Sequence, residues 1–208
     1  MQLSIFPLNV VLFPGTTLPL HLFEPRYRQL LADARQGDSR FGLLCSIPDV
    51  PERELPAGRI GCVAEITEVD PLPDGRANIL VRGVGRFALG AFLDAPTPYH
   101  QATVSTVDDD PIGNPVALAV AADELASNFR RIVNAVATLR PDGGPSPTLA
   151  DHPVTLAWQI AAMVDLDYDT RVALLAATDP AARVTRLDAT LRKVLPELEL
   201  RAALHPRP

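Results

Sequence analysis

The chain has 208 residues, of which 47% are hydrophobic and 21% are charged. This composition supports a substantial core, in one large domain or two small ones, and it excludes disordered and collagen-like chains. The formal net charge of −6 gives no general attraction for nucleic acid or for an anionic membrane. No stretch approaches the roughly 18 uninterrupted apolar residues of a membrane span, and no lysine or arginine precedes Arg26. We therefore expect a cytoplasmic protein.

The reactive residues disfavour several catalytic and metal-binding classes. Lys193 is the single lysine, and no glycine-rich loop precedes it, so the Walker A loop of an ATPase is missing from the sequence. A Ser–Lys peptidase would need the same lysine, which lies in an exposed-looking helical segment. Cys45 and Cys62 lie within apolar runs, as buried cysteines do. The histidines are widely separated, so we expect neither a metal site nor a cofactor.

Residues 1–107 have mostly the patterns of β-strands. Proline followed by glycine in Leu72–Gly75 predicts the turn of a hairpin. One helix is predicted over Glu24–Arg35, with Gly37 as its stop. Closure of the strands into a barrel or sandwich would remove exposed edges. Short apolar or alternating runs predict strands over Leu3–Phe6, Phe41–Ile47, Arg59–Val69, Ala77–Val84, Arg86–Leu93 and Ala102–Val107.

The segment Phe6–Phe23 is too apolar for one strand of alternating polarity, so part of it must be core. If another part stays exposed, in a groove edged by Pro14–Thr17, it would accept an extended apolar peptide by strand addition. Phe13, which lies beside this edge, is the candidate binding residue.

The composition changes after residue 107, because 19 of the 28 alanines lie in 108–208. Acidic residues, proline and glycine in 108–113 predict a linker. Asn114 and Pro115 then predict the N-cap and first residue of a long amphipathic helix. Further helix starts are predicted at His152–Pro153, Asp167–Tyr168 and Asp179–Pro180, with Pro196 bending or breaking the last helix. We therefore predict an α+β chain, with a β pseudobarrel over 1–107 and a four-helix unit over 114–208.

Several motifs resemble the signature of the Lon N-terminal domain. They are Ile5–Gly15, Leu18–Tyr27, Phe41–Leu44, Gly61–Ile66 and Gly83–Phe87. The resemblance implies a pseudobarrel of the PUA-like type followed by a helical segment, whose last helix is similar to Asp179–Glu199. In the full-length protease this domain precedes ATPase and Ser–Lys peptidase modules, which this sequence does not contain.

The function implied by the resemblance is that of a stand-alone Lon-domain protein. It would be a non-catalytic binding module that engages exposed apolar polypeptide segments or a protein partner, with neither ATPase nor Lon-type peptidase activity. We expect a monomer or weak homodimer that binds neither nucleic acid nor membrane. RNA binding, suggested only by the PUA-like resemblance, is disfavoured by the acidic pI near 5.2.

A second candidate site surrounds Glu24, Arg26 and Tyr27 at the start of the predicted helix. Glutamate there favours the helix dipole, and arginine is suited to hold a carboxylate or a carbonyl. The alternative is that these residues only fix the helix against the barrel. Together with Arg86, they would form a cleft between barrel and bundle for an enzyme or a small-molecule-binding protein, with the carboxylate and phenol as acid or base.

The segment Gly83–Gly90 also suggests a dinucleotide-binding loop. However, the residues after it alternate like a strand, whereas that loop must open a helix. We therefore predict a glycine-bent strand, in which missing side chains allow curvature or a close backbone approach.

Overall fold

The computed structural model describes residues 1–139 and 146–204, which divide into two units. The first, called the sheet unit, comprises residues 1–108 and 165–176. The second, called the helical unit, comprises the described residues of 109–164 and 177–208. Because the chain crosses between the units three times, each unit contains segments that are distant in the sequence.

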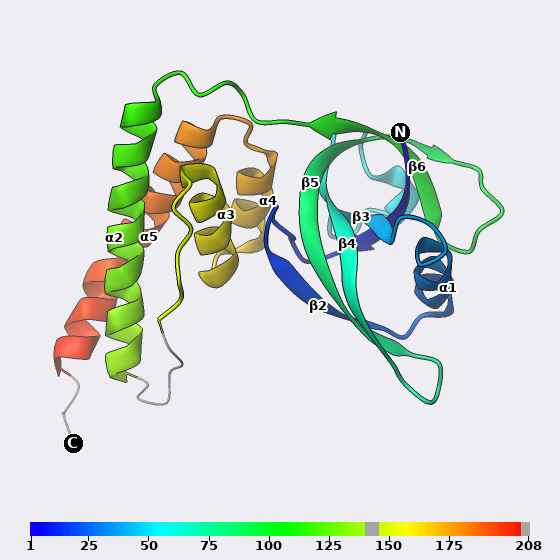
Figure 1. Ribbon diagram of the computed structural model, residues 1–208, viewed down its shortest axis with the longest axis horizontal. Helices are drawn as coiled ribbons and strands as arrows, with labels where there is room; N and C mark the ends of the chain where they lie inside the picture. The colour runs from blue at the N-terminus through cyan, green and yellow to red at the C-terminus, as the bar shows by residue number, and fades with distance from the viewer. Residues whose placement is uncertain (140–145, 205–208) are drawn as a thin grey trace. The chain divides into compact units, whose positions relative to one another are not determined.

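The sheet unit contains one mixed six-stranded sheet with the order β2-β5-β4-β3-β1-β6 (Figure 1). β1 and β3 are parallel, and all other pairs are antiparallel. β6 also pairs with β5, so five strands close on themselves and β2 extends from β5. The strands are β1 (Gln2–Leu8), β2 (Thr17–Leu22), β3 (Arg40–Cys45), β4 (Ile60–Pro71), β5 (Ala77–Leu93) and β6 (His100–Val107).

Strand β5 changes partners in its middle. Its first part pairs with β2 and its last part pairs with β6, while β4 accompanies both. Between the two parts the register with β4 skips Val84, which forms a β-bulge. The turn before β2 crosses β5 at this point. The Gly15 N–H donates to the Gly83 carbonyl at 2.8 Å, and the Gly83 N–H donates to the Thr16 carbonyl at 2.9 Å. The two strands predicted over Ala77–Val84 and Arg86–Leu93 are thus one bent strand.

Helix α1 (Pro25–Ala34) covers part of the sheet through Tyr27, Leu30 and Leu31. These side chains join a core cluster that includes Phe6 and Phe41, and the Phe6 and Tyr27 rings stack with centroids 3.8 Å apart. A short 3₁₀ helix, η1 (Glu52–Glu54), lies between β3 and β4. The predicted helix and strands are confirmed, except that Ala77–Val84 and Arg86–Leu93 form one strand and that β2 was not predicted as a separate strand.

The turn between β4 and β5 has the predicted hairpin chemistry. Gly75 has a φ of +81°, a left-handed conformation that glycine adopts without a Cβ penalty. Leu72 donates to the Arg76 carbonyl at 2.8 Å, and Gly75 donates to the Leu72 carbonyl at 3.0 Å. The predicted hairpin is therefore confirmed.

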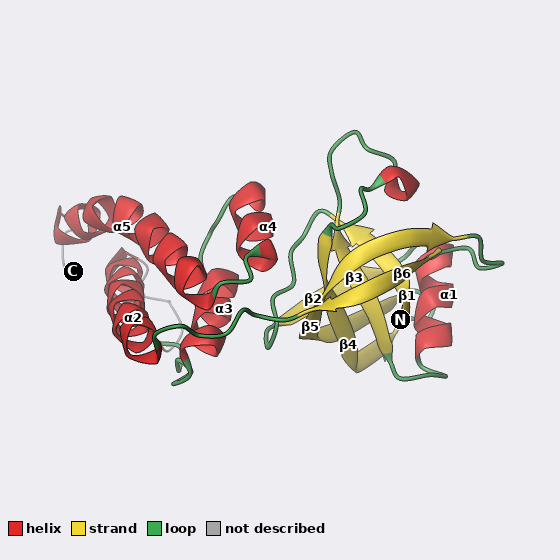
Figure 2. Cartoon of the chain, turned by 90° about the horizontal axis from the view of Figure 1, so that it is seen from above, coloured by secondary structure: helices red, strands yellow, loops and turns green. Residues whose placement is uncertain are grey.

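The helices of the second half begin where the sequence predicts. Asn114 caps α2, because its Oδ1 accepts a hydrogen bond from the Ala117 N–H at 3.0 Å. α2 and α5 lie side by side, as Figures 1 and 2 both show. The last helix continues through Pro196 and is not broken there. The four helices are α2 (Pro115–Leu139), α3 (Pro153–Met163), α4 (Tyr168–Ala176) and α5 (Pro180–Leu204).

The observed division differs from the predicted division at α4. The prediction placed all four helices in 114–208, but α4 belongs to the sheet unit. The Tyr168 hydroxyl donates to the Ser46 carbonyl at 2.7 Å, and Arg86 donates to the Leu175 carbonyl at 2.9 Å. The chain thus has an α+β fold, with one mixed sheet and five α-helices in its described residues.

A buried arginine, Arg183, holds the first residues of the helical unit in place. These residues lie within the predicted linker 108–113. Arg183 is 1% exposed. Its guanidinium donates to the Asp109 carboxylate and, at 2.7 Å, to the Ala177 carbonyl. The same group lies over the Trp158 ring, 3.7 Å from the centroid. Asp110 is held as well, because it exchanges hydrogen bonds with Thr178.

We expect Gly83→Ala to lower the free energy of unfolding by about 1–3 kcal/mol, because its Cβ would clash with the backbone carbonyl of Phe13. Gly85→Ala is the matched control on the same strand, since its Cβ would meet nothing within 4 Å. Urea denaturation followed by circular dichroism checks the difference. Equal midpoints for the two variants would contradict the close approach at Gly83.

We expect Arg183→Met to destabilise the helical unit by about 3–5 kcal/mol, because the Asp109 carboxylate would lose its buried partner. Trp158 is the single tryptophan, so its fluorescence in urea reports on this unit. Arg186→Met, at an exposed position of the same helix, should change stability by no more than about 0.5 kcal/mol. A similar loss in both variants would argue against the buried pair.

Candidate functional site

Strand β2 provides an open edge of the sheet. Within the described residues it pairs with β5 alone. Its exposure alternates, as expected for a strand with one covered face. The residues that face the core are Leu18, Leu20 and Leu22. The residues on the other face are exposed, and they are Thr17, Pro19 and His21.

Pro19 determines which backbone groups this edge offers. Pro19 lies opposite Leu80, whose carbonyl accepts a hydrogen bond from Thr67 on β4 at 3.0 Å. The Leu80 backbone therefore faces β4, and Pro19 and Leu80 form a pair without mutual hydrogen bonds. The Pro19 backbone consequently faces the open edge, where it offers a carbonyl but no N–H. Prolines within sheets are typical of edge strands.

An exposed aromatic residue follows this strand. Phe23 is 59% exposed, whereas every other phenylalanine, tyrosine and tryptophan is buried or half-buried. The His21 ring stacks on it, with centroids 6.1 Å apart and an interplanar angle of 23°. His21 Nδ1 in turn lies 2.8 Å from the Asn78 Oδ1 atom. We call the outward row of Pro19, His21 and Phe23, with the open edge of β2, the Phe23 surface.

The structure corrects the prediction for Phe13. Its side chain is 1% exposed, so it belongs to the interior and does not line an open groove. Its carbonyl accepts hydrogen bonds from the Thr16 N–H at 3.2 Å and the Thr16 hydroxyl at 2.9 Å. Phe13 therefore helps to close the turn that leads into β2.

The second candidate site is a cluster of ion pairs around Arg26. Arg26 Nε donates to Glu24 at 2.9 Å, and its two terminal nitrogens donate to Glu52 at 2.6 and 3.0 Å. The guanidinium carbon lies 4.4 Å from the centroid of the Tyr27 ring. Glu52 also lies 2.8 Å from His100 Nε2. The cluster therefore connects α1, η1 and β6 within the sheet unit.

The charges of this cluster are mutually satisfied. Partial burial alone would raise the pKa of Glu52, but the hydrogen bonds from Arg26 and His100 hold it below its usual value. Burial raises the pKa of Tyr27, and the Glu52 carboxylate adds to the shift. The Tyr27 hydroxyl is buried and has no hydrogen-bond partner among the described residues. At neutral pH the cluster thus contains a guanidinium held by two carboxylates beside a neutral phenol.

The structure engages Arg86 in a separate set of contacts. Its side chain is 5% exposed and donates to the Leu175 carbonyl of α4. Glu24, Arg26 and Tyr27 contact each other at the start of α1, where they fix the helix to its neighbours. This arrangement favours the interpretation in which the three residues orient the helix.

Both cysteines are buried. Burial raises the pKa of the Cys45 thiol to about 11 and that of the Cys62 thiol to about 12, so both are protonated at neutral pH. The described part of the chain contains no group of three His, Cys, Asp or Glu side chains arranged to hold a metal ion. None of its helices has the length and apolar character needed to cross a membrane.

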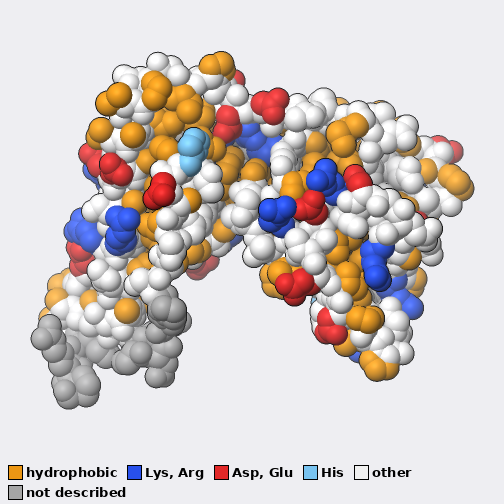
Figure 3. Space-filling view, in the orientation of Figure 1, with side chains coloured by type: hydrophobic (Ala, Val, Ile, Leu, Met, Phe, Trp, Pro, Cys, Tyr) orange, Lys and Arg blue, Asp and Glu red, His pale blue; other side chains and the backbone are white. Residues whose placement is uncertain are grey.

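Acidic and basic side chains alternate on the surface of the sheet unit. Glu65 accepts a hydrogen bond from Arg40 at 2.9 Å and one from Arg82 at 2.6 Å, which links three strands. Figure 3 shows positive and negative side chains beside one another on the visible face of this unit. This face therefore presents no broad area of one sign.

Sequence reasoning missed three residues of these sites. Phe23 was counted within the apolar segment, although its spacing of two from His21 and Pro19 would have placed it on the outward face. Glu52 and His100 gave no local signal, because 26 and 74 residues respectively separate them from Arg26.

We expect the Arg26–Glu52–His100 cluster to make stability depend on pH. Because the pKa of Glu52 is lowered in the folded protein, its contribution is present at neutral pH and is lost as pH falls. Urea denaturation between about pH 7 and pH 3 should show a smaller decrease in the free energy of unfolding for Glu52→Gln than for the wild type. Glu54→Gln, at an exposed position of the same 3₁₀ helix, is the control. Identical pH profiles for wild type and Glu52→Gln would contradict the assignment.

Comparisons with known proteins agree with the observed fold. The Lon N-terminal domain protein from Xanthomonas campestris superimposes with a TM-score of 0.65 at 26% identity, covering 91% of this chain and 98% of that one. The N-terminal domain of the Mycobacterium avium complex Lon protease has a TM-score of 0.64 at 17% identity, covering 92% and 98% of the two chains. The latter likeness concerns the fold alone.

In sequence comparisons, most of this chain aligns with one part of longer proteins. Lon protease 2 of Myxococcus xanthus is 29% identical over 88% of this chain and 22% of its own length. Lon protease 2 of Herpetosiphon aurantiacus is 27% identical over 96% of this chain and 25% of its own. The chain thus spans about a quarter of these relatives. The family model of the ATP-dependent protease La (LON) substrate-binding domain matches residues 2–193. The chain therefore belongs to the LON substrate-binding domain family.

Proposed function

We propose that this protein is a non-catalytic binding module whose Phe23 surface engages exposed apolar segments of other polypeptides. The observation that carries the proposal is the open edge of β2, which ends in a phenylalanine that is 59% exposed. An unpaired strand edge offers main-chain hydrogen bonds to any extended segment, and an adjacent aromatic side chain favours apolar residues. Membership of a substrate-binding domain family supports this function.

The mode of binding is strand addition beside β2. A segment of any sequence can form the main-chain hydrogen bonds, so the module tolerates diverse ligands. An apolar side chain of the segment packs on Phe23, whose ring His21 supports by stacking. This chemistry needs no nucleophile, metal or nucleotide.

Pro19 limits the length of the added strand. Because the proline nitrogen carries no hydrogen, the open edge lacks one donor in the middle of β2. A bound segment therefore pairs on either side of this position and not in one continuous ladder. The surface is thus suited to short, weakly held segments that are released readily.

The direct test measures fluorescence anisotropy of labelled peptides of about twelve residues with the purified full chain. An apolar peptide should bind saturably, and a copy N-methylated at alternate residues should bind less well, because it cannot donate to the edge. A labelled single-stranded RNA of the same size is the comparison probe. Saturable binding of the RNA with none of the peptide would overturn the proposal.

We expect Phe23→Ala to weaken peptide binding about tenfold, because the exposed ring supplies the apolar contact. The folded structure should persist, since the side chain packs little against its own chain. Val120→Ala is the matched control, because Val120 is 55% exposed but lies on α2. Equal affinities of the wild type and Phe23→Ala for the peptide would remove Phe23 from the site. Circular dichroism of each variant establishes that folding is unchanged.

A further inference from the structure

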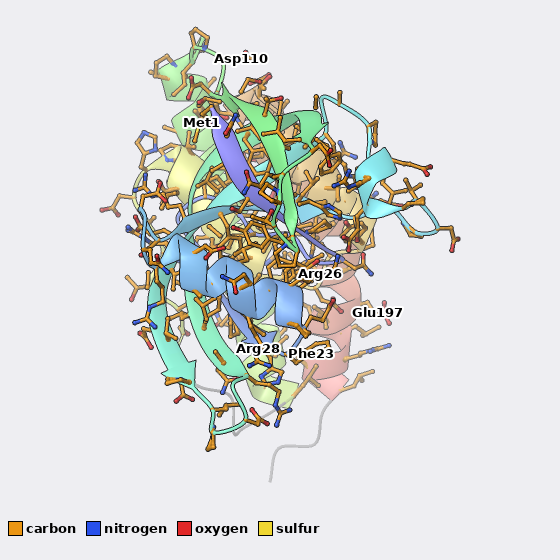
Figure 4. The ribbon with its side chains drawn as sticks, turned by 90° about the vertical axis from the view of Figure 1, so that its right-hand side faces the viewer. Met1, Phe23, Arg26, Arg28, Asp110 and Glu197 are labelled. Carbon is orange, nitrogen blue, oxygen red and sulfur yellow. The ribbon has the colours of Figure 1, made fainter. Side chains whose placement is uncertain are left out.

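We propose that Arg28 makes the Phe23 surface selective for apolar segments that carry an acidic side chain beside the apolar residues. This inference rests on the proposed function and names the class of segment that the surface prefers. Arg28 lies in the first turn of α1, five residues after Phe23. Figure 4 shows both side chains below α1 in that view.

The position of Arg28 is fixed by the hairpin between β4 and β5. A Cβ atom at Gly75 would collide with the Arg28 guanidinium, so that group lies directly against this turn. The same hairpin is held to β2, because Asn78 contacts both His21 and, at 3.3 Å, Asp70. Arg28 therefore belongs to the same side of the sheet unit as the exposed phenylalanine.

The Arg28 side chain differs from those of its neighbours. Within residues 1–139 and 146–204 its guanidinium forms neither a hydrogen bond nor an ion pair, although its backbone N–H donates to the Glu24 carbonyl at 3.0 Å as part of the helix. The nearby carboxylates are already engaged: Asp74 pairs with Arg76 at 2.6 Å, and Asp70 accepts from Asn78. Arg26, two residues earlier in the helix, is held by Glu24 and Glu52. This side of the sheet unit consequently presents one uncompensated guanidinium and one exposed phenyl ring.

Charge complementarity identifies the occupant. A guanidinium offers five N–H donors in a planar fork that matches the two oxygens of a carboxylate. An aspartate or glutamate side chain next to the apolar residue that packs on Phe23 would meet this fork. A lysine or arginine at that position would be repelled. The preferred ligand is thus an extended apolar segment with an adjacent acidic side chain.

The test compares amidated peptides that differ only in Glu or Gln beside the apolar stretch. Amidation removes the terminal carboxylate, so the side chain is the single source of negative charge under test. At low salt we expect the wild type to bind the Glu peptide about fivefold more tightly, which corresponds to an exposed charge pair. Added salt should reduce this preference.

The variant Arg28→Gln should bind both peptides equally, with the affinity that the wild type has for the Gln peptide. Arg28→Lys should keep part of the preference, because it retains the charge without the fork. Arg35→Gln is the matched control, since Arg35, at the other end of α1, is also exposed and forms no ion pair with any described residue. This control should keep the full preference.

Three outcomes would overturn the inference, and they distinguish its failure from that of the proposed function. If the wild type binds both peptides equally, or if Arg28→Gln keeps the preference, Arg28 has no selective role and the proposed function stands. If the wild type binds neither peptide, the proposed function fails and the inference fails with it.

Discussion

The bulge at Val84 is the feature on which the sheet unit depends. A single strand, β5, must pair with β2 in its first part and with β6 in its last part, and an unbent strand cannot follow both. The extra residue turns the strand, and the missing side chain of Gly83 lets the turn before β2 approach the backbone. The position of β2, and therefore that of Phe23 at its end, follows from this bend.

Arginine side chains tie the elements of each unit to each other. In the sheet unit, Arg26 connects α1 with η1, and Arg86 connects β5 with α4. In the helical unit, Arg183 connects the entering chain with α3 and α5. A guanidinium suits this role because it satisfies several acceptors from one planar group and keeps its charge when buried. Against this background, the Arg28 guanidinium, which forms no ion pair within the described residues, is a position open to a ligand on the same side of the sheet unit as Phe23.

Much of the fold could be predicted because its signals are local. A few adjacent residues specify a turn or a helix end at each of three places, which are Asn114–Pro115, Leu72–Gly75 and Glu24–Arg35. The placement of α4 with the sheet unit could not be predicted in this way. It depends on Arg86 and Leu175, which are 89 residues apart.

The candidate site was predicted only in outline. The sequence indicated an apolar segment suited to strand addition. Which of its residues are exposed, however, depends on which face of β2 packs on the core. Phe13 precedes the strand and turns inward, whereas Phe23 continues the outward row. The Arg26 cluster was equally hidden, because Glu52 reaches Arg26, and His100 reaches Glu52, only once the sheet unit has folded.

The three crossings of the chain between the units limit how the units can be exchanged by recombination. The chain leaves the sheet unit after Asp108, returns at Asp165 and leaves it again after Ala176. A recombination event at any one of these points would separate α4 from the strand that holds it, or would split the helical unit. Neither unit can therefore be exchanged alone by a single genetic junction. The two are expected to pass between proteins as one cassette, in keeping with a family match that spans residues 2–193 and thus includes parts of both units.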